Sequence, residues 1–179
     1  MDRVVIVGNS GSGKTTLAGR LAARKGCDHI ELDSLYHLED WRQAETGEFR
    51  AAVAARVAGD RWVACGNYAS KVADLVWARA DTMVVFDFPR RIVMWRVVRR
   101  TLRRMIRREE LWNGNREPIS NLFAFHDPER NIIRWAWSMH RTYAEGFRNA
   151  RTLPHLSHLE WIVLHDPREA DEFLARATE

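Results

Sequence analysis

The sequence predicts an α/β protein with a parallel sheet, because short apolar stretches alternate with amphipathic helical ones. Five short stretches are candidate strands: residues 3–7, 28–32, 61–65, 82–87 and 160–164. Six stretches have helical periodicity: residues 14–25, 44–59, 69–79, 89–110, 129–150 and 167–177. Strands and helices that alternate in this way place helices on both faces of the sheet.

Two of the expected helices begin at a proline, and one segment breaks the pattern. Pro89 and Pro167 occupy helix starts, where a missing N–H is tolerated, and Asp166 before Pro167 predicts an N-cap. Residues 111–128 contain Asn113-Gly114-Asn115 and two prolines and have no periodicity. We expect a loop or flap there, inside one domain that spans residues 1–179.

Composition narrows the class of protein. The chain has 179 residues, 46% of them hydrophobic, which is enough for a full core and argues against disorder. No run of eighteen apolar residues occurs, so we expect no membrane span, and the charged start at Asp2-Arg3 is unlike a signal peptide. The two cysteines, Cys27 and Cys65, lack metal-type spacing. They predict small buried residues in a reducing cytoplasm.

Charge is unevenly distributed along the chain. The formal net charge is +4, and the lysines are Lys14, Lys25 and Lys71, so nearly all other cations are arginines. Nine arginines fall between Arg90 and Arg108. This excess predicts an anionic partner and says nothing about the fold.

A complete G-x-x-x-x-G-K-[ST] motif stands between the first strand and the first helix. Its residues are Gly8, Asn9, Ser10, Gly11, Ser12, Gly13, Lys14 and Thr15, followed by Thr16. Glycines let successive backbone N–H groups point inward at phosphate oxygens, and the helix N-terminus favours anions. Lys14 suits the β- and γ-phosphates and the Thr15 hydroxyl suits Mg²⁺. Since strand, loop and helix occur in the required order, the sequence predicts nucleotide binding.

Polar residues at strand ends are candidates for the reacting groups. Asp33 follows the second strand and is our candidate carboxylate for the metal or for an accepting hydroxyl; a turn cap is the alternative. Asp87 follows the fourth strand and precedes a proline, so a cap is as good an interpretation. Asn67 and Tyr68 follow the third strand and could bind an acceptor, with a Gly-Asn turn as the alternative.

The arginine-rich helix allows two interpretations. Most of its arginines fit a solvated face. The sharper hypothesis concerns the basic stripe of Arg96, Arg100, Arg103 or Arg104, and Arg107, whose members nearest the sheet would hold phosphates. Arg96 and Arg100, one turn apart and the members of the stripe closest to Pro89, are the best placed.

In these motifs the chain resembles the P-loop kinases, the group that includes adenylate, shikimate and gluconate kinases. It resembles more closely the adenylate-kinase-like DNA topology modulation proteins (FlaR-like). The matching segments are Gly8–Thr16, Leu32-Asp33-x-Leu35-Tyr36, Trp62-Val63-x-x-Gly66-Asn67-Tyr68, Arg79–Thr82, Phe86–Arg90, the arginine helix and Asp166–Glu169.

The resemblance implies a three-layer P-loop NTPase fold with a five-stranded sheet in the order 2-3-1-4-5 and a lid at about residues 100–145. Adenylate kinases carry two arginines seven and eleven residues after the proline that follows the fourth strand; here these are Arg96, which would stack on adenine, and Arg100, which would contact phosphates. The later lid helix would supply Arg141. One departure is Cys65, where relatives commonly have an acidic residue that helps to hold the metal.

The expected function is therefore an ATP–Mg²⁺-dependent phosphotransferase that acts on a small molecule, in which Lys14 and Arg100 stabilise the transferring phosphoryl group. The alternative is a nucleotide-regulated nucleic-acid-binding protein that uses the arginines of residues 90–108. Both a monomer and a homodimer fit the sequence, and neither the acceptor nor the choice of ATP over GTP follows from it.

Overall fold

A computed structural model describes residues 1–124, 126–127 and 130–177. Its sheet has five parallel strands in the order β2-β3-β1-β4-β5, as the resemblance implies. The strands are β1 (Arg3–Gly8), β2 (Asp28–Glu31), β3 (Trp62–Cys65), β4 (Thr82–Phe86) and β5 (Glu160–Leu164). In this register Gly8 of β1 lies opposite Phe86 of β4, and Glu31 of β2 lies opposite Cys65 of β3.

All six expected helices are present, most of them shorter than expected. The α-helices are α1 (Lys14–Lys25), α2 (Leu32–Tyr36), α3 (Thr46–Arg56), α4 (Ala69–Val76), α5 (Arg90–Arg107), α6 (Ile132–Ala150) and α7 (Pro167–Arg176). Short 3₁₀ turns are η1 (Glu39–Trp41), η2 (Trp112–Gly114), η3 (Ile119–Phe123) and η4 (Pro154–Leu156). Residue 129, the expected start of α6, and positions 125 and 128 of the expected loop lie outside the described residues.

The main correction concerns α2. The sequence predicted a strand through residue 32 with Asp33 at its end. The strand ends at Glu31 instead, because Leu32 turns inward at 2% exposure and begins a five-residue helix that contains Asp33. A helix this short has no intrinsic stability, so its neighbours must hold it in place.

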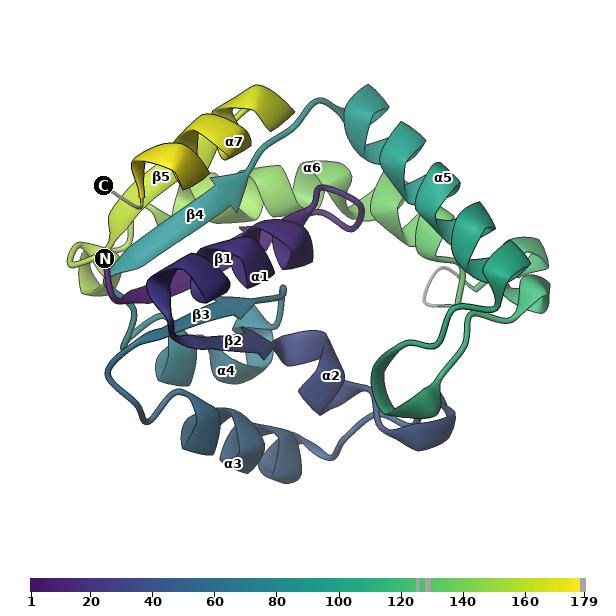
Figure 1. The fold of residues 1–179 in the computed structure, drawn as a ribbon, viewed down its shortest axis with the longest axis horizontal. Helices are drawn as coiled ribbons and strands as arrows, with labels where there is room; N and C mark the ends of the chain where they lie inside the picture. The colour runs from purple at the N-terminus through teal and green to yellow at the C-terminus, as the bar shows by residue number, and fades with distance from the viewer. Residues whose placement is uncertain (125, 128–129, 178–179) are drawn as a thin grey trace.

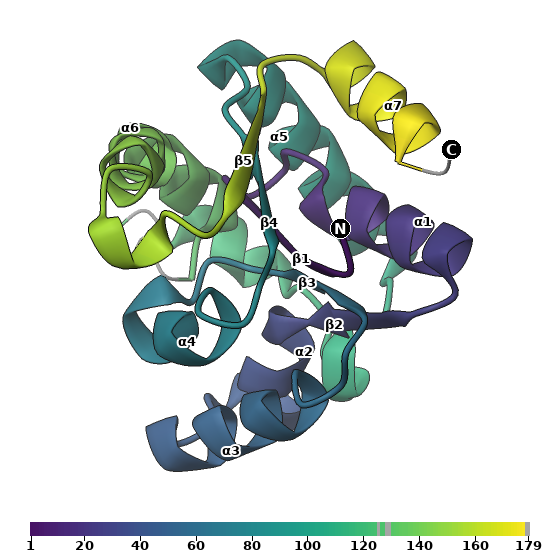
Figure 2. The same ribbon diagram turned by 90° about the vertical axis from the view of Figure 1, so that its left-hand side faces the viewer.

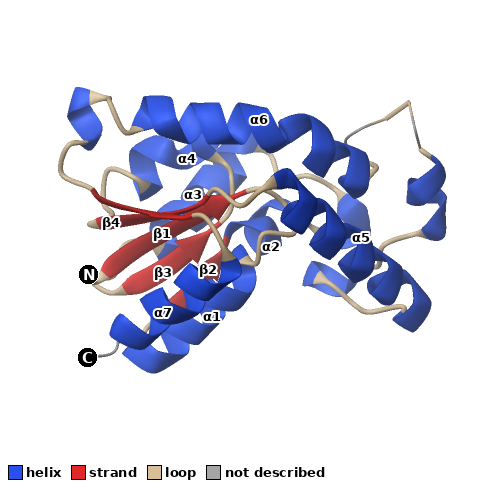
Figure 3. Cartoon of the chain, turned by 90° about the horizontal axis from the view of Figure 1, so that it is seen from above, coloured by secondary structure: helices blue, strands red, loops and turns tan. Residues whose placement is uncertain are grey.

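The sheet is sandwiched between two helical layers, which are seen from above in Figure 3. Val4 and Ile6 of β1 pack against α1, α7 and the start of α5, whereas Val5 and Val7 pack against α3, α4 and α6. Each of these valines and the isoleucine is at most 1% exposed. Alternation along one strand therefore feeds two cores, as expected for a strand buried on both faces.

Helix ends follow the local sequence. Pro89 is the N-cap of α5, and the Asp166 carboxylate accepts hydrogen bonds from the N–H groups of Arg168 and Glu169 at the start of α7, as predicted. Cys65 is buried and Cys27 is only half-buried, so the expectation of burial is confirmed for Cys65 alone. None of the described helices combines the length and the apolar character that crossing a bilayer requires.

Beyond the carboxyl ends of the strands, α5 extends away from the sheet and leads into residues 108–118 (Figures 1 and 2). These residues return toward α2 and η1. Segments about 75 residues apart in the chain therefore meet next to α2.

Candidate active site

The loop between β1 and α1, residues Gly8–Thr15, is shaped by its glycines. Gly8, Gly11 and Gly13 have φ values of 144°, 82° and 107°, a region that residues with a side chain rarely adopt. At Gly11 there is also no room: an added Cβ would lie 2.9 Å from the Cβ of Val97 on α5. The glycines therefore allow both the bend of the loop and its close contact with α5.

Two asparagines attach this loop to its surroundings. The Asn67 side chain donates to the Gly8 carbonyl oxygen at 2.6 Å and accepts from the Gly8 N–H at 3.2 Å. Asn9, which is 4% exposed, donates to the Ala136 carbonyl of α6 at 2.7 Å. The start of the loop is thus fixed to the end of β3 on one side and to α6 on the other.

Lys14 occupies a strongly electrostatic position. Its Nζ donates to the carbonyl oxygen of Asn9 at 2.9 Å. Burial lowers the pKa of Lys14, and the nearby Asp33 carboxylate opposes this shift. An ammonium group has three N–H donors, so Lys14 could also donate to an anion bound in the loop.

Arg96 and Arg100 both reach the loop, as expected from their spacing. Arg96 Nη1 donates to the Ser12 carbonyl at 2.9 Å, and its guanidinium lies 5.6 Å from the centre of the Phe88 ring. Arg100 Nη2 donates to Ser10 Oγ at 3.3 Å, and its Nε is buried with no hydrogen-bond partner among the described residues. The pKa of Arg100 is lowered to about 10. Burial is the larger cause, and the like charge of the neighbouring Arg104 is the second. An incompletely paired, buried guanidinium beside the loop is well suited to an incoming anion.

A third arginine of α5 is balanced by the segment that follows. Arg104 forms an ion pair of 3.1 Å with Glu117, and the two side chains are only 19% and 11% exposed. The second carboxylate oxygen of Glu117, Oε2, is buried and has no hydrogen-bond partner among the residues described. Glu117 therefore places a negative charge next to Arg104 and near Arg100.

Oxygen donors suited to Mg²⁺ lie at the start of α1. Thr15 Oγ1 donates to Glu31 Oε1 at 3.1 Å, and Cys65 Sγ lies 3.9 Å from the same hydroxyl. Glu31 and Cys65 are direct neighbours in the sheet register, so a carboxylate is present one strand away from the position where Cys65 interrupts the expected pattern. Hydroxyl and carboxylate oxygens fit Mg²⁺. No cluster of three or more His, Cys, Asp or Glu side chains with ligand geometry occurs among the described residues.

Asp33 and Tyr68 lie in contact with each other near the end of β3. The Tyr68 hydroxyl donates to Asp33 Oδ1 at 2.7 Å, and His37 Nε2 lies 3.4 Å from the same hydroxyl. Burial raises the pKa of Tyr68 and lowers that of His37, so both groups favour their neutral forms. Because the Tyr68 hydroxyl donates its proton to Asp33, the hydroxyl oxygen accepts from His37 Nε2. In a neutral His37 ring the other nitrogen, Nδ1, is then an acceptor, and it is buried with no hydrogen-bond partner in the part of the chain that the structure describes.

The structure does not bring every predicted residue to this place. Arg141 on α6 is 80% exposed and forms an ion pair with Glu145 at 2.6 Å. Asn67 uses both atoms of its amide on Gly8, which differs from the predicted acceptor contact. Thr16 directly follows Thr15 in the first turn of α1, and both residues are exposed.

Two residues of the site were missed in the sequence. They are Glu31 and His37. The signal for Glu31 was available: Glu31 and Asp33 are two residues apart at a strand end, next to the glycine loop.

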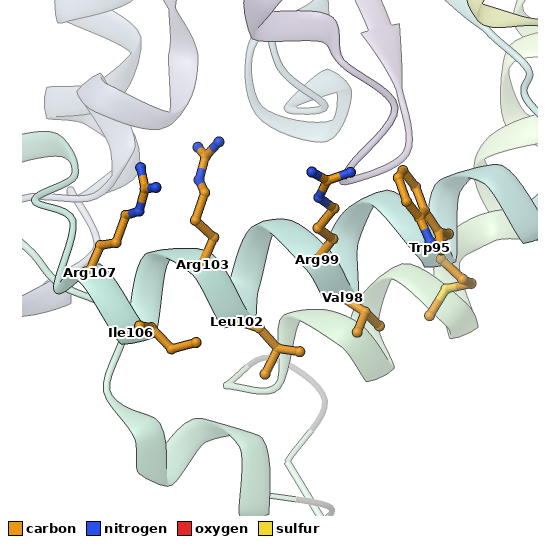
Figure 4. A pocket seen from close by; sticks show the side chains of 8 residues that line it. Trp95, Val98, Arg99, Leu102, Arg103, Ile106 and Arg107 are labelled. Atoms are coloured by element: carbon orange, nitrogen blue, oxygen red, sulfur yellow. The ribbon is translucent and has the colours of Figure 1, made fainter.

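A separate groove of about 690 Å³ runs along α5. Figure 4 shows Arg99, Arg103 and Arg107 pointing to one side of the helix and an apolar strip to the other. The exposed members of this strip include Leu102 at 44% and Ile106 at 80%, whereas Trp95, 61% exposed, lies on the same side as the arginines. This groove is distinct from the loop contacts of Arg96 and Arg100.

Comparisons with known proteins identify the fold. Neither a family model nor a curated protein sequence matches the chain. Among solved structures, a gluconokinase from Sinorhizobium meliloti 1021 is similar with a TM-score of 0.53 at 20% identity, covering 99% of this chain and 93% of the other. A shikimate kinase from Bacteroides thetaiotaomicron has a TM-score of 0.52 at 15% identity, with 98% and 95% covered. One from Acinetobacter baumannii, in complex with shikimate, has a TM-score of 0.51 at 13% identity, with 98% and 90% covered. The chain therefore has the five-stranded α/β fold of the P-loop kinases.

Proposed function

We propose that this protein is a P-loop kinase that transfers the γ-phosphoryl group of ATP to a hydroxyl group of a small molecule. The observation that carries the proposal is the proximity of three features: a phosphate-type loop, the cations Lys14 and Arg100, and the Asp33 carboxylate, whose charges act on one another. This combination supplies the parts that phosphoryl transfer requires: positioning, charge neutralisation and a proton acceptor.

On the donor side, backbone N–H groups of residues 9–15 and the N-terminus of α1 would bind the β- and γ-phosphates. Lys14 would exchange its contact with the Asn9 carbonyl for a phosphate oxygen. Arg96, which lies next to the Phe88 ring, would contact the base, and Arg100, which reaches Ser10 within the loop, would contact the transferred group.

On the acceptor side, Asp33 would accept the proton of the attacking hydroxyl group. At the same time the oxygen of that hydroxyl group would bond to the γ-phosphorus, and ADP would leave. Tyr68 holds Asp33 through the 2.7 Å hydrogen bond and keeps its carboxylate aimed. Arg141 has no part in this scheme, since its side chain is engaged with Glu145.

Thr15, Glu31 and Asp33 are the residues that would hold Mg²⁺, directly or through water. Bound there, the ion neutralises charge on the β- and γ-phosphates. We propose that Glu31 supplies the carboxylate that the sequence lacks at Cys65.

Calorimetry and turnover test this function. The wild-type chain is expected to bind ATP in the presence of Mg²⁺ and to transfer ³²P from ATP to a member of a panel of hydroxylated metabolites. Lys14→Ala is expected to abolish both, and Asp33→Asn to abolish transfer while ATP still binds. Lys25→Ala, at the far end of α1, is the matched control. A folded wild-type chain that binds no ATP with Mg²⁺ overturns the proposal.

The FlaR-like resemblance suggests a second candidate function, nucleic-acid binding. It is favoured by the α5 groove, where Arg99, Arg103 and Arg107 share one side and α5 contains no acidic residue. Binding of this kind weakens steeply as salt rises, because counterions compete for phosphate. Titration of a labelled duplex and a single strand at 50 and 200 mM salt tests it, and no binding at the lower salt rejects it.

A further inference from the structure

Two loops that are far apart in the sequence share one backbone pattern. His37–Gln43 and Glu110–Arg116 are each closed by an antiparallel bridge between their ends. In each, the second residue, a leucine, donates its N–H across the loop at 2.7 Å, and a 3₁₀ turn with positive φ follows. The first loop follows α2 and the second follows α5.

The buried amide of Asn115 joins these two loops. Its Nδ2 donates to the Leu38 carbonyl at 2.8 Å, and its Oδ1 accepts from the Trp41 N–H at 2.8 Å. A further bond from Nδ2 to the Trp112 carbonyl uses its remaining donor. The side chain is 4% exposed, so no other residue type can make the same three bonds in that space.

Asn113 of the second loop caps the helix that carries Asp33. Its Nδ2 donates to the carbonyl of Ser34 at 3.0 Å and to that of His37 at 2.6 Å. The carbonyls at the end of a helix lack partners within the helix, and α2 is only five residues long. The cap of α2 is therefore supplied from a segment almost 80 residues away.

Aromatic contacts close the same junction. Trp112 stacks on the His37 ring with centroids 5.9 Å apart and planes at 18°, and Trp41 Nε1 donates to the Arg116 carbonyl at 3.0 Å. Figure 1 shows the two loops meeting beyond α2, away from the sheet.

We propose that Asn113 and Asn115 are positioning residues for the acceptor side of the site, which hold α2 so that Asp33 faces Lys14 and Arg100. The proposal rests on the proposed kinase function for the meaning of Asp33. Tyr68 holds α2 from the sheet side, and the two asparagines hold it from the lid side. Without the second set, a one-turn helix keeps no fixed direction.

Hydrogen exchange measured by mass spectrometry tests the junction on the full chain. Asn113→Asp keeps the shape and the tolerance for positive φ but replaces the donor with an acceptor. Asn113→Gly relieves the positive φ of 56° and also removes the donor. In both variants, and in Asn115→Asp, exchange in peptides covering residues 32–43 is expected to quicken at least tenfold. Peptides of β1 and β4 are expected to be unchanged, as is every peptide of Asn149→Ala, the exposed control.

A kinetic measurement separates positioning from general stability. With water as the acceptor, Mg–ATP hydrolysis by Asn113→Asp is expected to have a kcat reduced at least tenfold and a KM for ATP within twofold of wild type. Unchanged exchange in residues 32–43, or an unchanged or raised kcat, overturns the proposal. Failure of the wild-type chain to bind Mg–ATP overturns the kinase function alone, since the exchange result stands by itself.

Discussion

The side-chain amide of Asn67 and the backbone of Gly8 exchange two hydrogen bonds, of 2.6 and 3.2 Å. The amide thereby acts as one more rung between β3 and β1, just beyond the last backbone pairing of Ile6 with Cys65. The glycine loop begins at this point, so its first residue is fixed in place although glycine itself makes no side-chain contact.

Asn67→Asp is expected to loosen the loop, because a carboxylate cannot donate to the Gly8 carbonyl. Loss of one partly buried hydrogen bond costs about 1–3 kcal/mol of unfolding free energy. Urea unfolding measures this, and calorimetry is expected to show at least tenfold weaker binding of Mg–ATP. Asn149→Ala is the control. Wild-type affinity in Asn67→Asp would contradict the anchoring role.

Gly11→Ala tests the contact between the loop and α5. The new Cβ would lie 2.9 Å from Val97 Cβ, and φ at this position is 82°. We therefore expect the free energy of unfolding to fall by about 1–3 kcal/mol. Gly146→Ala is the matched control: Gly146 lies within α6, where a Cβ has no neighbour within 4 Å. This second variant is expected to gain about 0.5–1 kcal/mol. Thermal unfolding of both compares them, and equal effects would refute the argument.

Arg100→Met is expected to stabilise the nucleotide-free protein while it weakens Mg–ATP binding. Burial lowers the pKa of Arg100 to about 10, and its Nε has no hydrogen-bond partner among the described residues, so the charge is unfavourable in the folded state. Replacement of a buried ion pair by apolar groups of similar size is often neutral or stabilising by about 1–4 kcal/mol, and we expect removal of an incompletely paired buried charge to act in the same direction. Melting temperature and calorimetry are the measurements. A clear loss of stability would show that Arg100 is well compensated.

His37 is expected to make stability depend on pH below neutrality. Burial lowers the pKa of His37 in the folded chain below 6.5, its value in the unfolded chain. As pH falls below 6.5, the unfolded chain binds a proton that the folded chain refuses, so stability decreases with acid. His37→Gln is expected to flatten urea unfolding free energies between pH 7.5 and 5.5. An identical slope in the variant would rule out this contribution.

The two thiols are expected to differ in reactivity. Burial raises the pKa of Cys65 to about 12, so almost no thiolate exists at pH 8. Cys27 is half-buried and more accessible. Ellman's reagent is expected to modify one thiol of the native wild-type chain, and none quickly in Cys27→Ser. Rapid modification of Cys27→Ser would show that the pocket around Cys65 opens.

Local patterns in the sequence predicted most of the fold. The strand–loop–helix order around Lys14 and the alternation of strands and helices identified a parallel α/β sheet, and α1 has the expected bounds. The spacing of Arg96 and Arg100 placed both on the side of α5 that meets the loop. These features depend on neighbours within a few residues, which a sequence displays directly.

The acceptor half of the site was not predictable in this way. Asp33 was expected at a strand end, but it lies in a short helix held by Tyr68 and Asn113, which are 35 and 80 residues further along the chain. Asn113-Gly114-Asn115 was interpreted only as a loop, because its partners, the carbonyls of residues 34–38, have no signature in the sequence.

The sequence by itself determined the glycine loop, the parallel sheet and the two arginines of α5 that reach the loop, since each arises from periodicity or from a contiguous motif. Only the tertiary structure decided that Glu31 stands beside Thr15, that Asn67 forms hydrogen bonds with Gly8, and that Arg141 is exposed and pairs with Glu145. The physical reason is that these outcomes are set by hydrogen bonds and charges between distant segments, and their geometry exists only once the chain has folded.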